Sequence, residues 1–372
     1  MGDTEYLFYK LKKHRYELHN IGEIGRKEYK TSKYIRSYLD KLGVDYKVYL
    51  DTGVVGIIKG RNPKKTIAFR SDIDALSTEK GVEHLCGHDG HMSILLGLIE
   101  HLNNNKDLLN DNIVFIFQPA EEAPGGAKEL IKLGVLKDYN VDEIYGLHIY
   151  PEIPEGYVGI RSGYFLAQSG EVDIDILAKS AHGAMPQNGV DAVVIASNII
   201  NSLQTIVSRN IGPIDNAVVT IGKITAGTVR NIIAENARLE GTIRTFNPNT
   251  YELMKKRIKE IVLGYEKVYN CKINLDIRDF YPSVNNDKIL YEEFLNILER
   301  NKIIILDPLM ISEDFSYYQK EVPGLFFMLG SRNEEKGYIN GLHNENFNFD
   351  EKIFLNALDI YIKLLKYKNS ID

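Results

Sequence analysis

Five short segments carry the residue types that bind divalent metal ions in proteins. The first, CGHDGH, places Cys86 two residues before His88 on a glycine-containing loop, so the thiol and the imidazole can chelate one cation. The other four segments contain the acids Asp72 and Asp74, the acids Glu121 and Glu122, His148, and His343. A cysteine ligand favours Zn, Ni or Co over Mg or Ca, and Mn fits a site otherwise built from nitrogen and oxygen donors.

Most of these residues follow predicted strands. The runs TIAFR and IVFIFQ precede Asp72 and Glu121, and His148 ends the predicted strand EIYGLHI. His343 lies on a loop shortly after the predicted strand GLFFMLG. Ligands bind at the carboxyl ends of the strands in open α/β sheets. The sequence therefore predicts one shared metal site at that edge of a sheet.

The two adjacent glutamates are predicted to have different roles. Consecutive side chains of an extended chain point in opposite directions, so Glu121 and Glu122 are predicted to act differently. One glutamate would bind metal while the other faces the substrate as a base. The plainer alternatives are two solvated glutamates in a loop and, for Cys86 and His88, a buried cysteine beside a helix-capping histidine.

The remaining candidates are weaker. Four histidines outside these segments are predicted to be surface or helix residues: His14, His19, His84 and His101. His91 lies one turn after His88 and is expected to support the loop. The pair Gly125 and Gly126 lacks the lysine and hydroxyl residue of a phosphate-binding loop, which argues against nucleotide binding there.

Composition limits the function classes. A chain of 372 residues is long enough for two domains. Lys and Arg total 45 against 51 Asp and Glu, so a net charge of −6 gives no general attraction to nucleic acid or anionic membrane. Two cysteines cannot build a disulfide framework, and no apolar run approaches a membrane span. We expect a soluble, cytoplasmic protein.

The order of predicted elements indicates an insertion. Strands alternate with helices up to about residue 169, which predicts an α/β domain with a mostly parallel sheet. Residues 170–281 then read as strand, helix, two strands, helix and strand, a ferredoxin-like α+β arrangement. The first domain resumes at about residue 282. The prediction is a catalytic metal-binding domain, 1–169 and 282–372, interrupted by an inserted domain, 170–281.

Eight motifs, in this order, resemble one family. The segments RSDIDAL, CGHDGHM, FIFQPAEE, LHIYP, SAHGAMPQ, ISEDFSYY, PGLFFMLG and GLHNENF are similar to those of the zinc-peptidase-fold amidohydrolases, which include aminoacylase, hippurate hydrolase and indoleacetyl-amino-acid hydrolase. The resemblance runs through nearly the whole chain. It implies metal-dependent hydrolysis of an N-acyl amino acid, two divalent ions per subunit, and an inserted domain that acts as a lid or dimerisation surface of a homodimer or larger homo-oligomer.

The resemblance also implies roles for individual residues. Five side chains would be metal ligands: Cys86, His88, Glu122, His148 and His343. Glu121 would be the catalytic general base and Asp72 a supporting acid near the metal. His182, in the inserted domain, would stabilise the oxyanion and act from the partner subunit. Asn231 and Arg244 would contact the substrate.

Within the family, four further segments point to one branch. FIFQPAEEAPGGA, LQTIVSRN, VVTIGKITAGTVRNIIAE and ARLEGTIRT resemble the enzymes that convert N-acetyl-LL-2,6-diaminopimelate and water to LL-2,6-diaminopimelate and acetate in lysine biosynthesis. The chain departs from the family pattern between Asp74 and Cys86, where only eleven residues replace a longer segment, and at Ser77, which replaces a proline.

The sequence leaves two alternative functions open. A broad N-acyl-amino-acid amidohydrolase or small carboxypeptidase would use the same chemistry with a looser pocket. A catalytically silent metal-binding scaffold, disabled by the shortened segment, belongs to another class. The presence of Glu121 argues against the scaffold, because a pure binding module needs no base beside the metal.

Overall fold

The computed structural model describes residues 3–122 and 124–372, and its chain divides into two compact units. Unit 1 comprises Met1–Gly163, Asn285–Asp307 and Asp314–Asp372, and unit 2 comprises Tyr164–Val284 and Pro308–Glu313. The inserted domain proposed from the sequence, 170–281, lies within unit 2. The short strands β9 (Gly163–Leu166) and β14 (Val284–Asn286) lie where the chain passes between the units.

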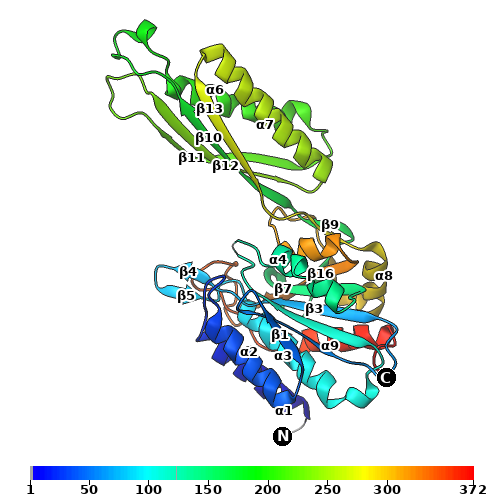
Figure 1. Ribbon diagram of the computed structural model, residues 1–372. Coiled ribbons are helices and arrows are strands. Elements are labelled where there is room, and N and C mark those ends of the chain that lie inside the picture. The colour runs from blue at the N-terminus through cyan, green and yellow to red at the C-terminus, as the bar shows by residue number, and fades with distance from the viewer. Residues whose placement is uncertain (1–2, 123) are drawn as a thin grey trace. The chain divides into compact units, whose positions relative to one another are not determined.

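Unit 1 is built on an eight-stranded sheet (Figure 1). In spatial order the strands are β1 (Tyr46–Tyr49), β2 (Gly53–Ile58), β6 (Asn112–Gln118), β3 (Thr66–Asp72), β7 (Glu143–Pro154), β16 (Gly324–Arg332), β8 (Val158–Ile160) and β15 (Ile303–Ile305). The four central strands, from β6 to β16, are mutually parallel. Antiparallel pairs join β1 to β2, β2 to β6 and β16 to β8, so the sheet is mixed, with the predicted parallel core at its centre.

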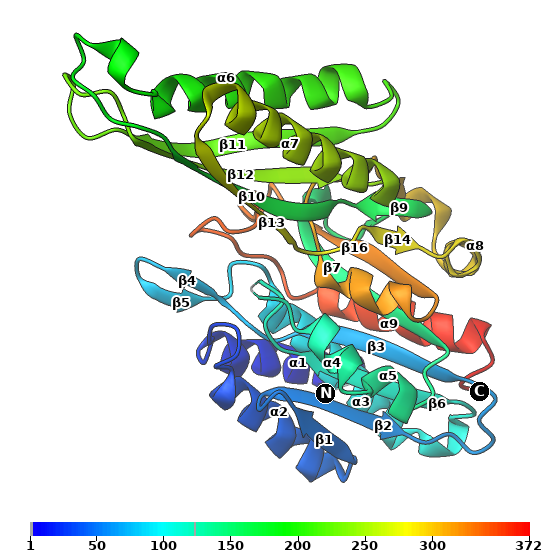
Figure 2. The same ribbon diagram turned by 45° about the horizontal axis from the view of Figure 1, so that its top comes forward.

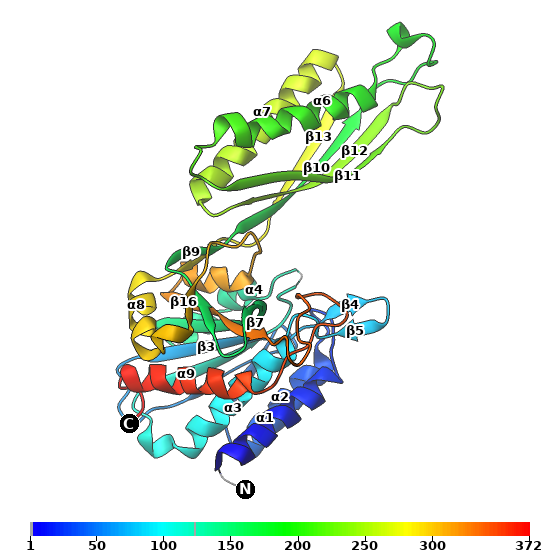
Figure 3. The same ribbon diagram turned by 180° about the vertical axis from the view of Figure 1, so that it is seen from behind.

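Helices cover both faces of this sheet. The helices of unit 1 are α1 (Asp3–His19), α2 (Tyr29–Leu42), α3 (His88–Asn104), α4 (Ala127–Lys132), α5 (Val135–Asp138), α8 (Lys288–Ile297) and α9 (Ile353–Tyr367), with short 3-10 turns at Lys106–Leu108, Arg300–Lys302 and Asp314–Lys320. Neighbouring residues of β16 face opposite sides, as a strand requires. Phe327 packs on Phe294 of α8 and Tyr361 of α9, whereas Phe326 packs on Phe315. The helices α8 and α9 are labelled in Figure 3.

Local sequence signals explain where several helices begin and end. Asp287 accepts hydrogen bonds from the backbone N–H groups of Ile289 and Leu290 and so caps the start of α8. Gly43, in the left-handed region at φ 64°, ends α2. The shortened segment before Cys86 forms a hairpin of two short strands, β4 (Leu76–Thr78) and β5 (Gly81–Glu83).

Unit 2 has the predicted order of strand, helix, two strands, helix and strand. Its elements are β10 (Gln168–Leu177), a 3-10 turn (Pro186–Asn188), α6 (Ala192–Thr205), a π-helical turn (Ile206–Asn210), β11 (Ala217–Ala226), β12 (Asn236–Thr245), α7 (Pro248–Tyr269) and β13 (Lys272–Asp279). The antiparallel sheet has the order β11, β12, β10, β13, which is the ferredoxin-like topology. The two helices lie on the same face of that sheet and share one apolar core with it (Figure 2).

No helix in the described part of the chain is long and apolar enough to cross a membrane.

Candidate metal centre

The predicted site residues of unit 1 come from the carboxyl edge of the central strands and from the loops around it. Asp72 is the last residue of β3, and the two glutamates follow β6. His88 is the first residue of α3. The prediction that His148 ends its strand is wrong, because β7 continues to Pro154. His148 lies in the middle of β7 and pairs with Met328 of β16.

The predicted ligands lie together. Three sets of donor atoms, each within 4.8 Å of one another, overlap: Cys86, His88 and His148; Cys86, Glu122 and His343; and His88, Glu121 and Glu122. Every predicted ligand and the predicted base thus belongs to one continuous cluster. The cluster combines one thiol, three imidazoles and two carboxylates, a donor set that suits a borderline transition metal.

Two of the histidines present a ring nitrogen to the cluster in the way metal ligands do. His88 donates its Nδ1–H to the carbonyl of Asp74 at 2.9 Å, and His148 donates its Nδ1–H to the carbonyl of Ile149 at 2.7 Å. Metal-binding histidines usually hold the second ring nitrogen through such a bond. The Nε2 atom of His88 is buried and has no hydrogen-bond partner among the described residues, and Oδ2 of Asp72 lies 3.7 Å away. An unsatisfied nitrogen at this position fits a bound cation.

Cys86 and His343 close the cluster on the outer side. The Sγ atom of Cys86 lies 3.4 Å from Nε2 of His148 and 3.3 Å from Nε2 of His343. His343 has a left-handed backbone, φ 64°, and its N–H donates to the carbonyl of Leu85 at 2.8 Å. Its Nε2 atom lies 3.3 Å from Oε1 of Glu122. The backbone bond to Leu85 links the loop of His343 to the residue directly before Cys86.

The electrostatics of the cluster favour cations. Burial lowers the pKa of His88, but Asp72 and Asp74 outweigh it and raise the pKa to about 10. Burial lowers the pKa of His148 to about 3, so its imidazole is neutral. Burial and the nearby glutamates raise the pKa of Cys86 well above its usual value. A divalent ion competes with protons for such ligands, because metal binding requires the deprotonated forms.

Asp72 is held by a fully buried network. Nε2 of His91 accepts from the N–H of Ile149 at 2.9 Å, so its Nδ1 carries the proton and donates to Asp72 at 2.7 Å. Arg70 donates to Asp72 at 2.8 Å. Burial raises the pKa of Asp72, but its cationic neighbours, above all His88, bring it well below the usual value. His91 therefore contacts Asp72 and Ile149, which lie outside the loop that it was predicted to support.

The glutamate turn, Pro119–Glu122, is fixed by buried carboxylates. The N–H groups of Glu121 and Glu122 donate to the two oxygens of Asp74 at 3.1 and 3.0 Å. The N–H of Ala120 donates to Glu28 at 2.9 Å, and Ala120 has a left-handed backbone at φ 58°. The chain is therefore not extended here. The premise that the two glutamates point in opposite directions is wrong, since both have an oxygen close to His88.

Sequence reasoning missed three residues of this support. Asp314 accepts from the N–H groups of Gly126 and Ala127 at 2.9 and 3.0 Å, at the start of α4, and from Arg70 at 2.9 Å. The available signal for Asp314 was the acidic pair Glu313 and Asp314 before the aromatic residues of ISEDFSYY. Arg70 is fully buried and bonds to both Asp72 and Asp314. The available signal for Arg70 was a charged residue inside the predicted strand before Asp72. Glu28 offered none, because it lies far from the site in sequence.

Two histidines predicted to be surface or helix residues are buried. His14 is 4% exposed and His84 is 3% exposed. His14 lies within α1, as predicted for a helix residue, but it faces the protein. Burial lowers the pKa of each imidazole to about 4. His19, also on α1, bonds to Asp89 at 2.8 Å, beside His88.

The three candidates of unit 2 lie in two different places within that unit. His182 is exposed and pairs through a β-bridge with Ile232, the residue after Asn231. Nδ1 of His182 accepts from the N–H of Ala184 at 3.1 Å, so Nε2 carries a proton that it can donate. Arg244 lies eight residues along β12 from Asn236, or roughly 27 Å at about 3.4 Å per residue.

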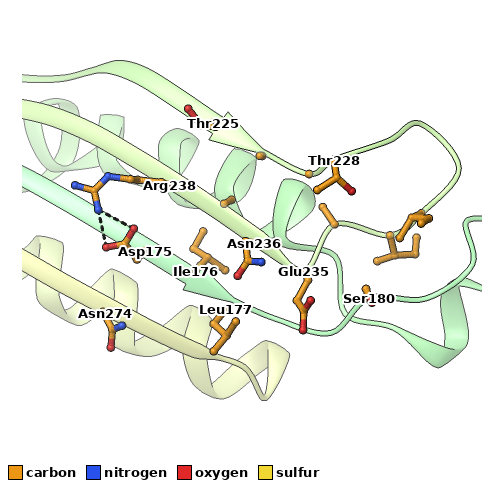
Figure 4. A pocket seen from close by; sticks show the side chains of 16 residues that line it. Asp175, Ile176, Leu177, Ser180, Thr225, Thr228, Glu235, Asn236, Arg238 and Asn274 are labelled. Carbon is orange, nitrogen blue, oxygen red and sulfur yellow. Dashed lines mark hydrogen bonds and ion pairs between the residues drawn. The ribbon is translucent and has the colours of Figure 1, made fainter.

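A cavity of about 600 Å³ lies at the His182 end of unit 2 (Figure 4). It is lined by Ser180, Thr228 and Glu235 among others, so the loops that follow β10 and β11 both border it. On its strand side Arg238 forms two bonds to Asp175, at 2.8 and 2.9 Å. His182 is two residues beyond Ser180. The structure thus groups His182 with Asn231 but not with Arg244.

Comparison with known proteins places these residues in a family. Residues 68–367 match the model of peptidase family M20/M25/M40. The N-acetyldiaminopimelate deacetylase of Anoxybacillus flavithermus is 41% identical over 368 residues, 94% of each chain. The N-acetyldiaminopimelate deacetylase of Listeria monocytogenes is 40% identical over 371 residues, 95% of this chain and 98% of its own.

Solved structures agree with that match. A candidate aminohydrolase from methicillin-resistant Staphylococcus aureus is 33% identical, with a TM-score of 0.91 over 98% of this chain and 97% of its own. A dinuclear metal-binding peptidase of the M20 family from Bacillus subtilis is 29% identical, with a TM-score of 0.83 over 97% of this chain and 98% of its own. The fold predicted from the sequence is confirmed.

Proposed function

The chain belongs to peptidase family M20/M25/M40, and from that premise we propose that it hydrolyses N-acetyl-LL-2,6-diaminopimelate to LL-2,6-diaminopimelate and acetate. The observation that carries the proposal is the continuous cluster of donor side chains with a second glutamate beside it. The choice of substrate follows from the related deacetylases, which are similar to this chain over nearly its whole length. Lysine biosynthesis follows from that substrate.

Five residues are proposed to hold a pair of divalent ions: Cys86, His88, Glu122, His148 and His343. Cys86 belongs to two of the overlapping donor sets, which suits a site for two ions. The related Bacillus subtilis peptidase binds two metals, which supports the same count here. Bound divalent metal polarises a carbonyl and brings the pKa of water toward neutrality.

Glu121 is proposed as the general base. It is 7% exposed, and Asp74 fixes its backbone through the bond at 3.1 Å. In this role its carboxylate takes a proton from the attacking water and passes it to the departing amine. The different roles proposed for Glu121 and Glu122 then depend on the turn that carries them, and not on side chains that alternate along an extended chain.

The remaining roles concern unit 2. His182 is proposed to donate its Nε2–H to the oxyanion that forms on the acyl carbon, from a second copy of the chain in a homodimer. Asn231, which lies next to the bridge between Ile232 and His182, is proposed to contact the substrate, as is Arg244. The inserted domain would then act as a lid and as the dimer surface.

The substrate is tested by product release from the metal-loaded protein. Acetate release from N-acetyl-LL-2,6-diaminopimelate and from N-acetylmethionine is compared with benzoate release from hippurate. We expect a preference of roughly 100-fold in kcat/KM for the first, equal to about 2.7 kcal/mol. Comparable rates on all three would instead indicate a broad amidohydrolase, and no release with metal bound would indicate a silent scaffold.

A further inference from the structure

A groove between α1 and α2 lies outside the metal cluster and has no role in the proposed hydrolysis. The two helices lie side by side in unit 1 (Figures 1 and 3). The groove encloses a cavity of about 440 Å³, within the range of small-molecule sites. It is lined by Tyr6, Tyr9, Lys10, Lys13, His14, Glu17, Tyr34, Ser37, Tyr38 and Lys41.

The walls of the groove are aromatic. Four of its ten lining residues are tyrosines, from both helices. Tyr6 and Tyr9 are 52% and 56% exposed, and the Nζ atom of Lys10 lies over the Tyr6 ring, 4.5 Å from its centroid. The rings of Tyr34 and Tyr38 contact His14 edge-on, with centroids 5.9 and 4.3 Å away. A flat ring placed between these walls would bury aromatic surface on both sides.

The floor of the groove is fixed by contacts of its buried side chains. His14 is 4% exposed, and its Nδ1 atom lies 2.8 Å from the hydroxyl of Tyr34. Tyr38 donates instead to Glu100 at 2.6 Å, and Lys10 pairs with the other oxygen of Glu100.

The charge of the groove is positive. Three lysines and one glutamate line it, and each oxygen of Glu100 beneath it already bonds to a groove side chain, Lys10 or Tyr38. Lys13 and Lys41 make no ion pair with a described residue, yet both act on His14 electrostatically, which places their charges near the floor. An anion entering the groove would meet two unpaired ammonium groups. Among the described residues that line the groove, Glu17 is the one carboxylate that a cation would meet.

We infer that the α1–α2 groove is a binding site for a small organic anion that carries a flat ring. The tyrosine walls take the ring, and Lys13 and Lys41 take the anionic group. Nucleoside phosphates and aromatic carboxylates share this chemistry. The inference does not rest on the proposed hydrolysis, because no groove residue belongs to the metal cluster.

Calorimetric titration of the metal-loaded protein tests the inference, with AMP, 4-hydroxybenzoate, adenosine and inorganic phosphate as probes. We expect saturable binding of AMP or 4-hydroxybenzoate with Kd below about 1 mM. Whichever of the two binds identifies the source of the anion. Adenosine, which lacks charge, and phosphate, which lacks a ring, should bind at least roughly tenfold more weakly.

Paired charge reversals place the binding in the groove. The double change Lys13→Glu and Lys41→Glu should weaken the binding of the ring-bearing anion at least roughly tenfold. Tyr9→Ala should weaken its binding as well. Lys12→Glu with Lys33→Glu changes the same charge at exposed positions of the same helices and should leave the affinity unchanged. The inference would be overturned if neither anion showed saturable binding. It would also be overturned if binding survived the reversal of Lys13 and Lys41, because such binding would belong to the metal cluster.

Discussion

The donors of unit 1 and the His182 loop of unit 2 both carry histidine, but they are built in opposite ways. His88 and His148 are buried, and each has one ring nitrogen fixed by a backbone carbonyl. His182 is exposed, and a single bond from its own loop sets its tautomer. Binding a cation requires several donors held in place, whereas stabilising an oxyanion requires one donor that can reach a substrate. The four predictions that follow test this contrast.

The largest effect is expected from Glu121→Gln. The change keeps the shape of the side chain but removes the base, so kcat should fall by roughly 10³- to 10⁴-fold. Acetate release measures the rate, and metal analysis of the purified variant should give wild-type content, because Glu122 and the other proposed ligands remain. A variant that keeps near-wild-type kcat would remove Glu121 from the mechanism.

His182→Ala should lower kcat by roughly 10²- to 10³-fold while metal content and Tm stay at wild-type values. The side chain is exposed and lies in the other unit, so its loss leaves the donors of unit 1 intact. Gln187→Ala, at an exposed position of the same loop, is the matched control and should retain activity. Loss of metal from the His182 variant would contradict the contrast between the two regions.

His14 extends the contrast to a buried histidine near which no described carboxylate outweighs the effect of burial on its pKa. Burial lowers its pKa to about 4, against an ordinary 6.5 in the unfolded chain. Below pH 6.5 the unfolded chain binds a proton that the folded protein does not, so stability is lost as the pH falls from about 6.5 to about 4, by up to about 3 kcal/mol. Urea unfolding should show a shallower loss in His14→Gln over this window. Parallel curves for the two proteins would refute the assignment.

Glu28→Ala should have the smallest effect on turnover, roughly tenfold in kcat. The change leaves the buried N–H of Ala120 without an acceptor, which costs about 1–3 kcal/mol and loosens the turn before Glu121. Glu28→Gln retains an acceptor oxygen and should restore most of the rate. If both variants fall equally in kcat while Tm is unchanged, Glu28 does not position the turn.

The sequence predicted those features that follow from strand order and residue type. Apolar runs followed by acids or histidines located the carboxyl edge, and the ferredoxin-like unit followed from its alternating strands. The failures have a physical cause in each case. His148 lies inside β7 because that strand extends past its neighbour β3, and apolar periodicity does not show where pairing ends.

Tertiary hydrogen bonds account for the other misses. The left-handed backbone of Ala120 turns both glutamates toward His88, and it depends on Glu28, which is 92 positions away. Asp314 fixes the start of α4 from the far end of the chain. Nothing in the local sequence around the glutamates specifies either partner. The burial of His14 likewise depends on tyrosines of a second helix.

The most direct test of the account is acetate release from N-acetyl-LL-2,6-diaminopimelate before and after the metal is removed. Chelator-treated protein, shown by metal analysis to be free of divalent ions, should lose activity and regain it when Zn, Mn, Co or Ni is added back. Recovery should reach its maximum near two equivalents per chain. Wild-type rates in protein that contains no metal would contradict the central claim that this cluster of donors catalyses hydrolysis through bound metal.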